Sequence, residues 1–178
     1  MNSPWLLLIY TVPAEPTRKR AYVWREIKKV GGVYVRDGVC ALPERAETVA
    51  AAQTIAAKIQ EFEGQATVVR GASLEPSRAE AIVAQFNTAR SDEYAEIARE
   101  AERLLQHVAR ETEHRDFSFA ELEELEEDLA KVKRWMSQIQ SRDYFPNGSG
   151  NQAEKLLTRC DEALAEFLEA AAARDSSV

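Results

Sequence analysis

The spacing of apolar residues divides the chain into two parts with different periods. In the first part, apolar runs typical of strands alternate with runs of helical period. Residues 5–12 (WLLLIYTV) form an apolar run that is too short to cross a membrane and that ends at a proline, so it predicts a buried strand. Residues 33–42 (VYVRDGVCAL) carry the turn signal Asp37-Gly38 between two short strands, which predicts a hairpin.

Two helices and a last strand complete the first part. The helices are predicted at about residues 17–30 and between Pro43 and Gly64, and the strand at residues 66–70. Glycines follow both helices, as is common just after a helix end. The resulting order, β-α-β-β-α-β, predicts a ferredoxin-like domain over residues 1–72.

The second part, residues 73–178, has a helical period throughout and predicts a separate helical domain. Its first helix is expected to begin near Pro76 and to break near residues 87–91, and Ser118 with Glu121 forms the sequence of a capping box at the start of the next helix. Three helices with short connections predict an antiparallel helical hairpin or a three-helix bundle, so the whole chain is expected to be α+β. The apolar positions recur with 3-4 spacing at Tyr94, Ile97, Ala101, Leu104 and Val108, at Leu122, Leu125, Leu129, Val132, Met136 and Ile139, and at Leu157, Cys160, Leu164, Phe167 and Ala171.

Charge is distributed unevenly between the two parts. The net charge is −7, but residues 1–72 carry ten Lys/Arg against seven Asp/Glu, whereas residues 73–178 carry thirteen against twenty-three. Such an asymmetry indicates different partners for the two parts. The composition is that of a globular protein, and Cys40 and Cys160 lack any metal-binding spacing. We therefore expect a protein of the reducing cytoplasm with no membrane partner.

Positive charge is concentrated in the first predicted helix. At 100° per residue, Arg18, Arg25 and Lys29 fall within about 40° of one another, with Lys28 beside them and apolar residues on the opposite side. Arg36, at the hairpin turn, is close in sequence to the same edge. Each guanidinium presents a planar fork that suits phosphate or another oxyanion, so a surface of this kind predicts contacts with such an anion, and nucleic acid is one such partner. The alternative is a merely solvated helix face.

The acidic run at residues 121–128 raises the question of a metal site. It contains the i,i+4 pair Glu124 and Asp128, and Glu111-x-x-His114 has a spacing used in di-iron bundles. However, the inward-facing residues of these helices are apolar, and acidic residues in a first helical turn complement the helix dipole. We therefore predict no metal site and no cofactor, and we interpret His107 as a residue at the edge of the bundle.

The spacing of several aromatic residues and of one arginine also indicates structural roles. Trp24, Trp135 and Tyr94 are interpreted as core or interface aromatics, and Arg20 falls on the apolar side of the first helix near its start. No nucleophile elbow, zinc-protease, P-loop or dinucleotide-binding sequence occurs. Hydrolytic and nucleotide-dependent activities are therefore not expected.

Two segments resemble the N-terminal region of the ChrB family of chromate-resistance regulators: WLLLIYTVPAEPTRKRAYVWREIKKVGGVYVRDGVCALPE and FAELEELEEDLAKVKRWMSQIQSRDYF. The resemblance extends from Trp5 to about Ala172 and implies a chromate-responsive transcriptional regulator. The first part is also similar to the ferredoxin-like domain of PaaX repressors and of small CRISPR-associated nucleases. Those nucleases place an Asp at the end of the first strand, where this chain has Tyr10-Thr11-Val12, so we expect no nuclease activity and no enzyme.

The resemblance implies two kinds of binding. Operator DNA is expected to contact the five basic residues above, and a homodimer would duplicate them. Chromate or a similar oxyanion is expected at an arginine cluster where the two parts meet, formed by Arg90, Tyr94, Arg134 and Arg142. The alternatives are a non-catalytic interaction or dimerisation scaffold and a metal-dependent enzyme.

Overall fold

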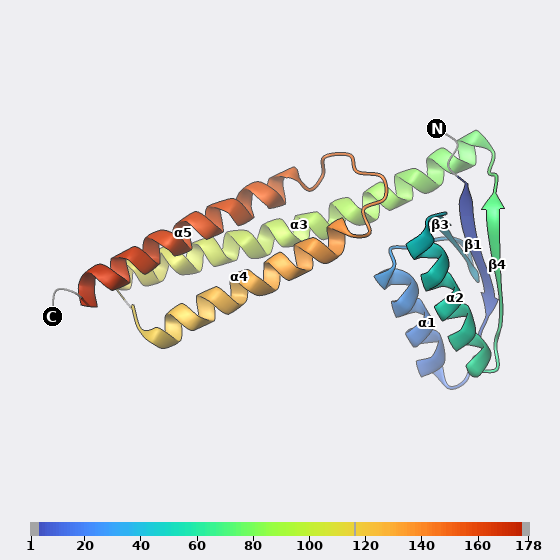
Figure 1. The fold of residues 1–178 in the computed structure, drawn as a ribbon, viewed down its shortest axis with the longest axis horizontal. Coiled ribbons are helices and arrows are strands. Elements are labelled where there is room, and N and C mark those ends of the chain that lie inside the picture. Colours follow the sequence, from blue (N-terminus) through green and yellow to red (C-terminus); the bar gives the residue numbers. More distant parts are fainter. Residues whose placement is uncertain (1–3, 116, 176–178) are drawn as a thin grey trace. The chain divides into compact units, whose positions relative to one another are not determined.

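The computed structural model describes residues 4–115 and 117–175, which adopt an α+β fold (Figure 1). The described residues contain one four-stranded antiparallel sheet and five helices, which confirms the predicted class. In chain order the elements are β1 (Trp5–Thr11), α1 (Thr17–Lys29), β2 (Val33–Arg36), β3 (Val39–Pro43), α2 (Ala46–Glu61), β4 (Gln65–Ala72), α3 (Pro76–His114), α4 (Phe119–Gln140) and α5 (Asn151–Asp175).

The chain divides into two compact units. Unit 1 comprises Met1–Asn87 and Arg142–Phe145, and unit 2 comprises Thr88–Ser141 and Pro146–Val178. This division differs from the predicted domains, 1–72 and 73–178. The first turns of α3 and a short segment after α4 pack with the sheet, and neither contact is visible in the sequence pattern.

The sheet of unit 1 has the strand order β2-β3-β1-β4. Leu8 of β1 pairs with Cys40 of β3 and with Val68 of β4, so these three side chains share one face of the sheet. Helices α1 and α2 lie side by side over that face (Figure 1) and add Val23 and Ile59 to its core. This packing explains the apolar period of both helices, since each buries one side.

Glycines set the connections on either side of β2. The N–H of Gly31 donates to the C=O of Lys28, and the N–H of Gly32 donates to the C=O of Ile27, each at 3.0 Å. With φ at +72° for Gly31, these bonds form a Schellman motif that ends α1 as predicted. The predicted hairpin is also confirmed, and Gly38 adopts φ +70° in its turn.

A second apolar cluster in unit 1 includes the segment 142–145. The ring of Trp5 lies 6.3 Å from that of Phe86 on α3 and 5.8 Å from that of Phe145, measured between centroids. The hydroxyl of Tyr144 donates to the C=O of Val30 at 2.7 Å. This segment, which follows α4, therefore supplies aromatic side chains to the core of unit 1.

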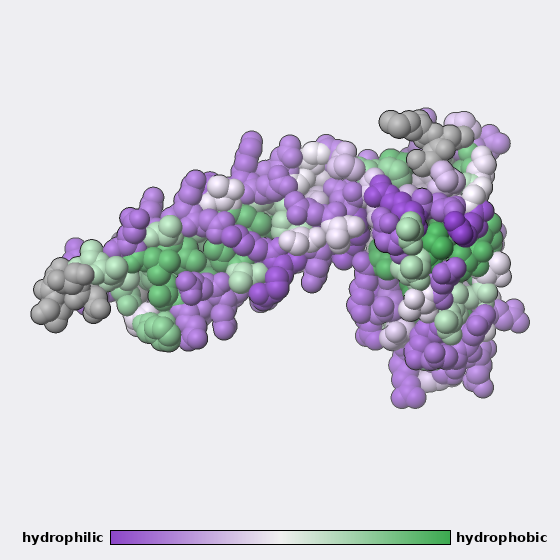
Figure 2. All heavy atoms as spheres, in the orientation of Figure 1, coloured by the Kyte–Doolittle hydropathy of each residue, from purple (hydrophilic) through white to green (hydrophobic). Residues whose placement is uncertain are grey.

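Helices α3, α4 and α5 share one apolar core in unit 2. On the face shown in Figure 2, apolar side chains also lie in patches between polar ones over these helices. Most of the predicted 3-4 positions are buried in it, including Ile97, Leu125 and Phe167. The Oγ of Ser118 accepts from the N–H of Glu121 at 3.3 Å, which confirms the predicted helix cap.

The predicted break in α3 near residues 87–91 is wrong. The helix is continuous from Pro76 to His114, and it contains neither Gly nor a Pro beyond its first residue. Phe86 and Tyr94, on either side of the expected break, are both buried, so core contacts hold the helix there. Within the described residues no helix has both the length and the apolar character needed to span a membrane.

Candidate functional site

All five basic residues predicted to bind phosphate lie exposed on unit 1. Arg18, Arg25, Lys28 and Lys29 are on α1, and Arg36 is the last residue of β2. These five residues are called the cationic surface below. The opposite side of α1 is buried in the core, so packing against the sheet turns the basic side chains outward.

Acidic neighbours neutralise little of the cationic surface. Within the described part of the chain, Lys29 is the one of the five with an ion-pair partner, because its Nζ lies 2.6 Å from Oε1 of Glu26. Lys28 and Lys29 occupy the last turn of α1, where a positive charge also complements the helix dipole. That local role does not apply to Arg18, Arg25 or Arg36, which leaves them available to an external anion.

A groove of about 580 Å³ on unit 1 was not anticipated from the sequence. Its lining includes Tyr10, Arg20, Trp24, Tyr34 and Asp37. Trp24 is 52% exposed and is therefore not a core residue. The sequence feature that could have indicated this groove was the position of Trp24 at the border of the apolar side of α1, with Arg20 one turn before it.

Two tyrosine hydroxyls meet in this groove. The hydroxyl oxygens of Tyr10 and Tyr34 are 2.9 Å apart. Burial raises the pKa of both hydroxyls above the ordinary tyrosine value, so both keep their protons at neutral pH. One hydroxyl donates to the other, and the second O–H can donate to a bound ligand.

The four residues predicted to bind an oxyanion are divided between the units. Arg90 and Tyr94 lie one turn apart on α3 in unit 2, and each is 4% exposed. Arg134 is exposed on α4 in the same unit, whereas Arg142 belongs to unit 1. Nη2 of Arg90 lies 3.1 Å from Oε2 of Glu93, so a carboxylate already contacts this guanidinium.

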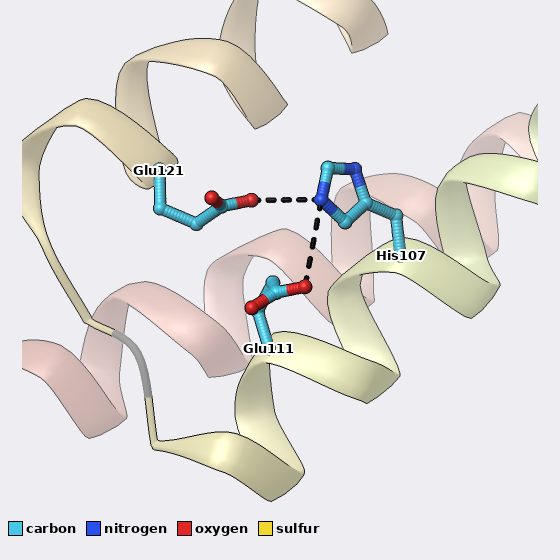
Figure 3. Close-up of side chains that lie close together, drawn as sticks. All are labelled: His107, Glu111 and Glu121. Carbon is cyan, nitrogen blue, oxygen red and sulfur yellow. Dashed lines mark ion pairs between the residues drawn. The ribbon is translucent and has the colours of Figure 1, made fainter.

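A histidine and two glutamates converge between α3 and α4 in unit 2 (Figure 3). Nε2 of His107 lies 2.8 Å from Oε1 of Glu121 and 3.7 Å from Oε1 of Glu111. The sequence hypothesis paired Glu111 with His114, but His114 is exposed at the end of α3. The i,i+4 spacing of His107 and Glu111 could have predicted that these two side chains are neighbours. The approach of Glu121 could not be predicted in this way, because it depends on the packing of two helices.

Both cysteines are buried as free thiols. Burial raises the pKa of Cys40 to about 12 and that of Cys160 to about 11. Thiols with such pKa values are poor nucleophiles at neutral pH, so neither residue belongs to a reactive site.

Comparison with known proteins relates most of the chain to one family. The family described as "Protein ChrB, N-terminal" matches residues 20–176. Protein ChrB of Cupriavidus metallidurans (strain ATCC 43123 / DSM 2839 / NBRC 102507 / CH34) is 29% identical over 153 residues. The aligned region covers 86% of this chain and 44% of that relative, so the chain spans less than half of the relative's length. No solved structure matches the chain.

Proposed function

Because the chain belongs to the family of ChrB N-terminal regions, we propose that it is a cytoplasmic, non-enzymatic module of a chromate-responsive transcriptional regulator. In this proposal, unit 1 binds the phosphates of operator DNA through the cationic surface. The observation that carries the proposal is the exposure of all five predicted residues. Four of them have no ion-pair partner within the described residues. Exposed arginines of this kind suit phosphate because of their planar donor geometry.

The dimensions of α1 support contacts with several phosphates. Its 13 residues make it about 20 Å long, which corresponds to about six base steps of duplex DNA. The neighbouring groove places exposed Trp24 next to Arg20 on the same helix, and such a pair can stack on an unpaired base. Phosphate contacts would supply affinity, while these groove residues would add a preference for nucleic acid over other polyanions.

We also infer the finer architecture that the sequence predicted. The order of elements in unit 1 and the sheet order β2-β3-β1-β4 support a ferredoxin-like arrangement. The shared apolar core of α3, α4 and α5 supports a three-helix bundle in unit 2.

DNA binding is tested by salt-dependent titration of a labelled duplex from the region upstream of the gene for this chain. Replacing Arg25 and Lys28 with glutamine should weaken binding at low salt. It should also reduce the slope of log K against log salt by about 0.9 for each phosphate that the protein no longer neutralises. The matched control replaces Lys155 and Arg159 with glutamine, because these exposed basic residues lie on α5 in unit 2. Equal weakening in both double variants, or no binding by the unchanged protein at low salt, would leave the scaffold interpretation in place.

The chromate response is proposed to involve Arg90 and Tyr94. Arg90 is the one charged side chain among the described residues that is buried, and a buried guanidinium attracts an anion strongly because water screens it little. A bound oxyanion would have to share Arg90 with the carboxylate of Glu93. Removing that negative charge should therefore strengthen anion binding.

Calorimetry with chromate, and with sulfate as competitor, tests this part separately from DNA binding. We expect Glu93→Gln to bind chromate more tightly and Arg90→Gln to lose binding. Arg99→Gln serves as the control, since Arg99 is an exposed arginine on the same helix. The absence of heat with either anion, or identical affinities in all variants, would exclude this site.

A further inference from the structure

We propose that His107, Glu111 and Glu121 bind a divalent transition-metal ion of the zinc or manganese type in unit 2. One imidazole nitrogen and two carboxylates are a donor set that such ions accept. The three ligand atoms lie within 4.8 Å of one another. The proposal goes beyond DNA or oxyanion binding, and it departs from the sequence analysis, which predicted no metal site and interpreted His107 as a residue at the edge of the bundle.

Two adjacent helices fix the three side chains. His107 and Glu111 are one turn apart on α3 and therefore point in the same direction. Glu121 is in the first turn of α4, where its backbone N–H is held by the side chain of Ser118. Figure 3 shows both carboxylates directed at the same imidazole edge. The cluster is thus built on regular elements and not on loops.

The distances in the cluster are close to those of an occupied site. Ligand atoms bound tetrahedrally at about 2.0–2.1 Å from a zinc ion are about 3.3 Å apart. Here Nε2 of His107 is 2.8 Å from Glu121 and 3.7 Å from Glu111, so the two spacings lie on either side of that value. Shifts of about half an ångström within the side chains would bring the donors around a shared ion.

The charges in the cluster also favour a cation. Nε2 of His107 is a single nitrogen, yet carboxylate oxygens of both Glu121 and Glu111 face it. The side chains of His107, Glu111 and Glu121 are only 21%, 13% and 17% exposed, which weakens the screening of the two negative charges by water. A divalent ion would neutralise Glu121, would share Glu111 with the guanidinium of Arg110 and would engage Nε2 at the same time.

Surrounding groups match the outer environment of a metal site. Nε of Arg110 donates to Oε1 of Glu111 at 2.9 Å and holds that carboxylate in place, as outer partners of metal ligands do. Glu124 and Asp128 form a second group with His107 further along α4, so additional carboxylates are within reach. A cavity of about 490 Å³ includes His107, Asp128 and Trp135 in its lining, so it reaches the imidazole and one carboxylate of the second group.

The experiment uses the full chain, stripped of metal with a chelator and titrated by calorimetry with zinc, manganese and magnesium chlorides. We expect one zinc or manganese ion per chain and binding of magnesium that is weaker by about tenfold or more. Glu121→Gln should weaken zinc binding by about tenfold or more, because it removes a ligand charge with little change of shape. The matched control is Glu126→Gln, which removes the same charge from an exposed position on the same helix.

A second variant distinguishes the loss of a metal ligand from misfolding of the protein. His107→Gln combined with Glu111→Gln alters only α3, and circular dichroism checks that each variant retains its helices. Loss of binding in Glu121→Gln and in this double variant, with Glu126→Gln unchanged, supports the site. No binding by the unchanged protein, or equal weakening by Glu121→Gln and Glu126→Gln, overturns it. The three residues would then form an ion-pair cluster only.

Discussion

Replacing Gly31 with alanine should destabilise unit 1 more than its backbone strain alone explains. Gly31 has φ +72°, a conformation in which a Cβ costs about 1–2 kcal/mol. A Cβ at this position would lie 2.9 Å from Cβ of Arg142 and 3.2 Å from its backbone oxygen. These atoms cannot move without displacing segment 142–145, which the hydrogen bond from Tyr144 to Val30 holds. A steric cost therefore adds to the strain.

Gly71 provides a matched control for the strain. It also has a positive φ, +66°, but an added Cβ meets nothing within 4 Å. Gly71→Ala should therefore cost about 1–2 kcal/mol in the free energy of unfolding. Overpacking adds about 1–3 kcal/mol, so Gly31→Ala should cost about 2–5 kcal/mol. The difference measures the contact between the end of α1 and segment 142–145.

Urea unfolding followed by tryptophan fluorescence measures both costs. A Trp135→Phe background confines the signal to Trp5 and Trp24, which lie in unit 1. Combining Gly31→Ala with Arg142→Gly in a double-mutant cycle should show a coupling energy above about 0.5 kcal/mol, since it removes one of the clashing atoms. Equal destabilisation by Gly31→Ala and Gly71→Ala, or additive effects in the cycle, would refute the reasoning.

Three further predictions concern buried groups. The Thr48 hydroxyl, 1% exposed as a residue, donates to the C=O of Pro43 at 2.7 Å, so Thr48→Val should cost about 1–3 kcal/mol in urea unfolding; an unchanged midpoint would contradict this. Burial raises the pKa of Cys40 from 9.0 to about 12, so its contribution to stability is complete below pH 9 and is lost as pH rises towards 12. Cys40→Ala should therefore flatten the fall in stability measured above about pH 9, and an unaltered slope would count against it. Leu125→Ala, at a fully buried position, should cost about 2–5 kcal/mol, whereas Phe119→Ala, at a position 78% exposed, should change thermal stability by less than about 0.5 kcal/mol.

The features that the sequence predicted correctly depend on residues close together in the chain. Gly31-Gly32 ends α1 through hydrogen bonds to carbonyls only a few residues earlier, and Asp37-Gly38 forms a turn within the hairpin itself. The Ser118 cap likewise needs only the N–H of Glu121. Such signals are readable because the partner of each group lies within one turn or one hairpin.

The features that the sequence did not predict depend on contacts between distant segments. Segment 142–145 packs against Trp5, and no periodicity indicates that a loop residue such as Phe145 enters the core of unit 1. The meeting of His107 and Glu121 depends on which turn of α4 lies beside which turn of α3. The helical spacing places Trp24 at the border of the apolar side of α1. Spacing alone does not tell whether another segment covers such a residue, and among the described residues Trp24 is left 52% exposed.

The two units also explain how an acidic protein can present a cationic surface. By sequence, unit 1 carries twelve Lys/Arg against ten Asp/Glu, and unit 2 carries eleven against twenty. The net charge of −7 therefore arises in unit 2, and it describes the surface of neither unit. At physiological ionic strength, charges more than about 8 Å apart are largely screened, so a phosphate at α1 responds to the charges beside it and not to the net charge of the chain. The same reasoning applies in unit 2, where the cation that we propose would respond to the carboxylates of Glu111 and Glu121 facing His107 and not to the acidic excess of the whole unit.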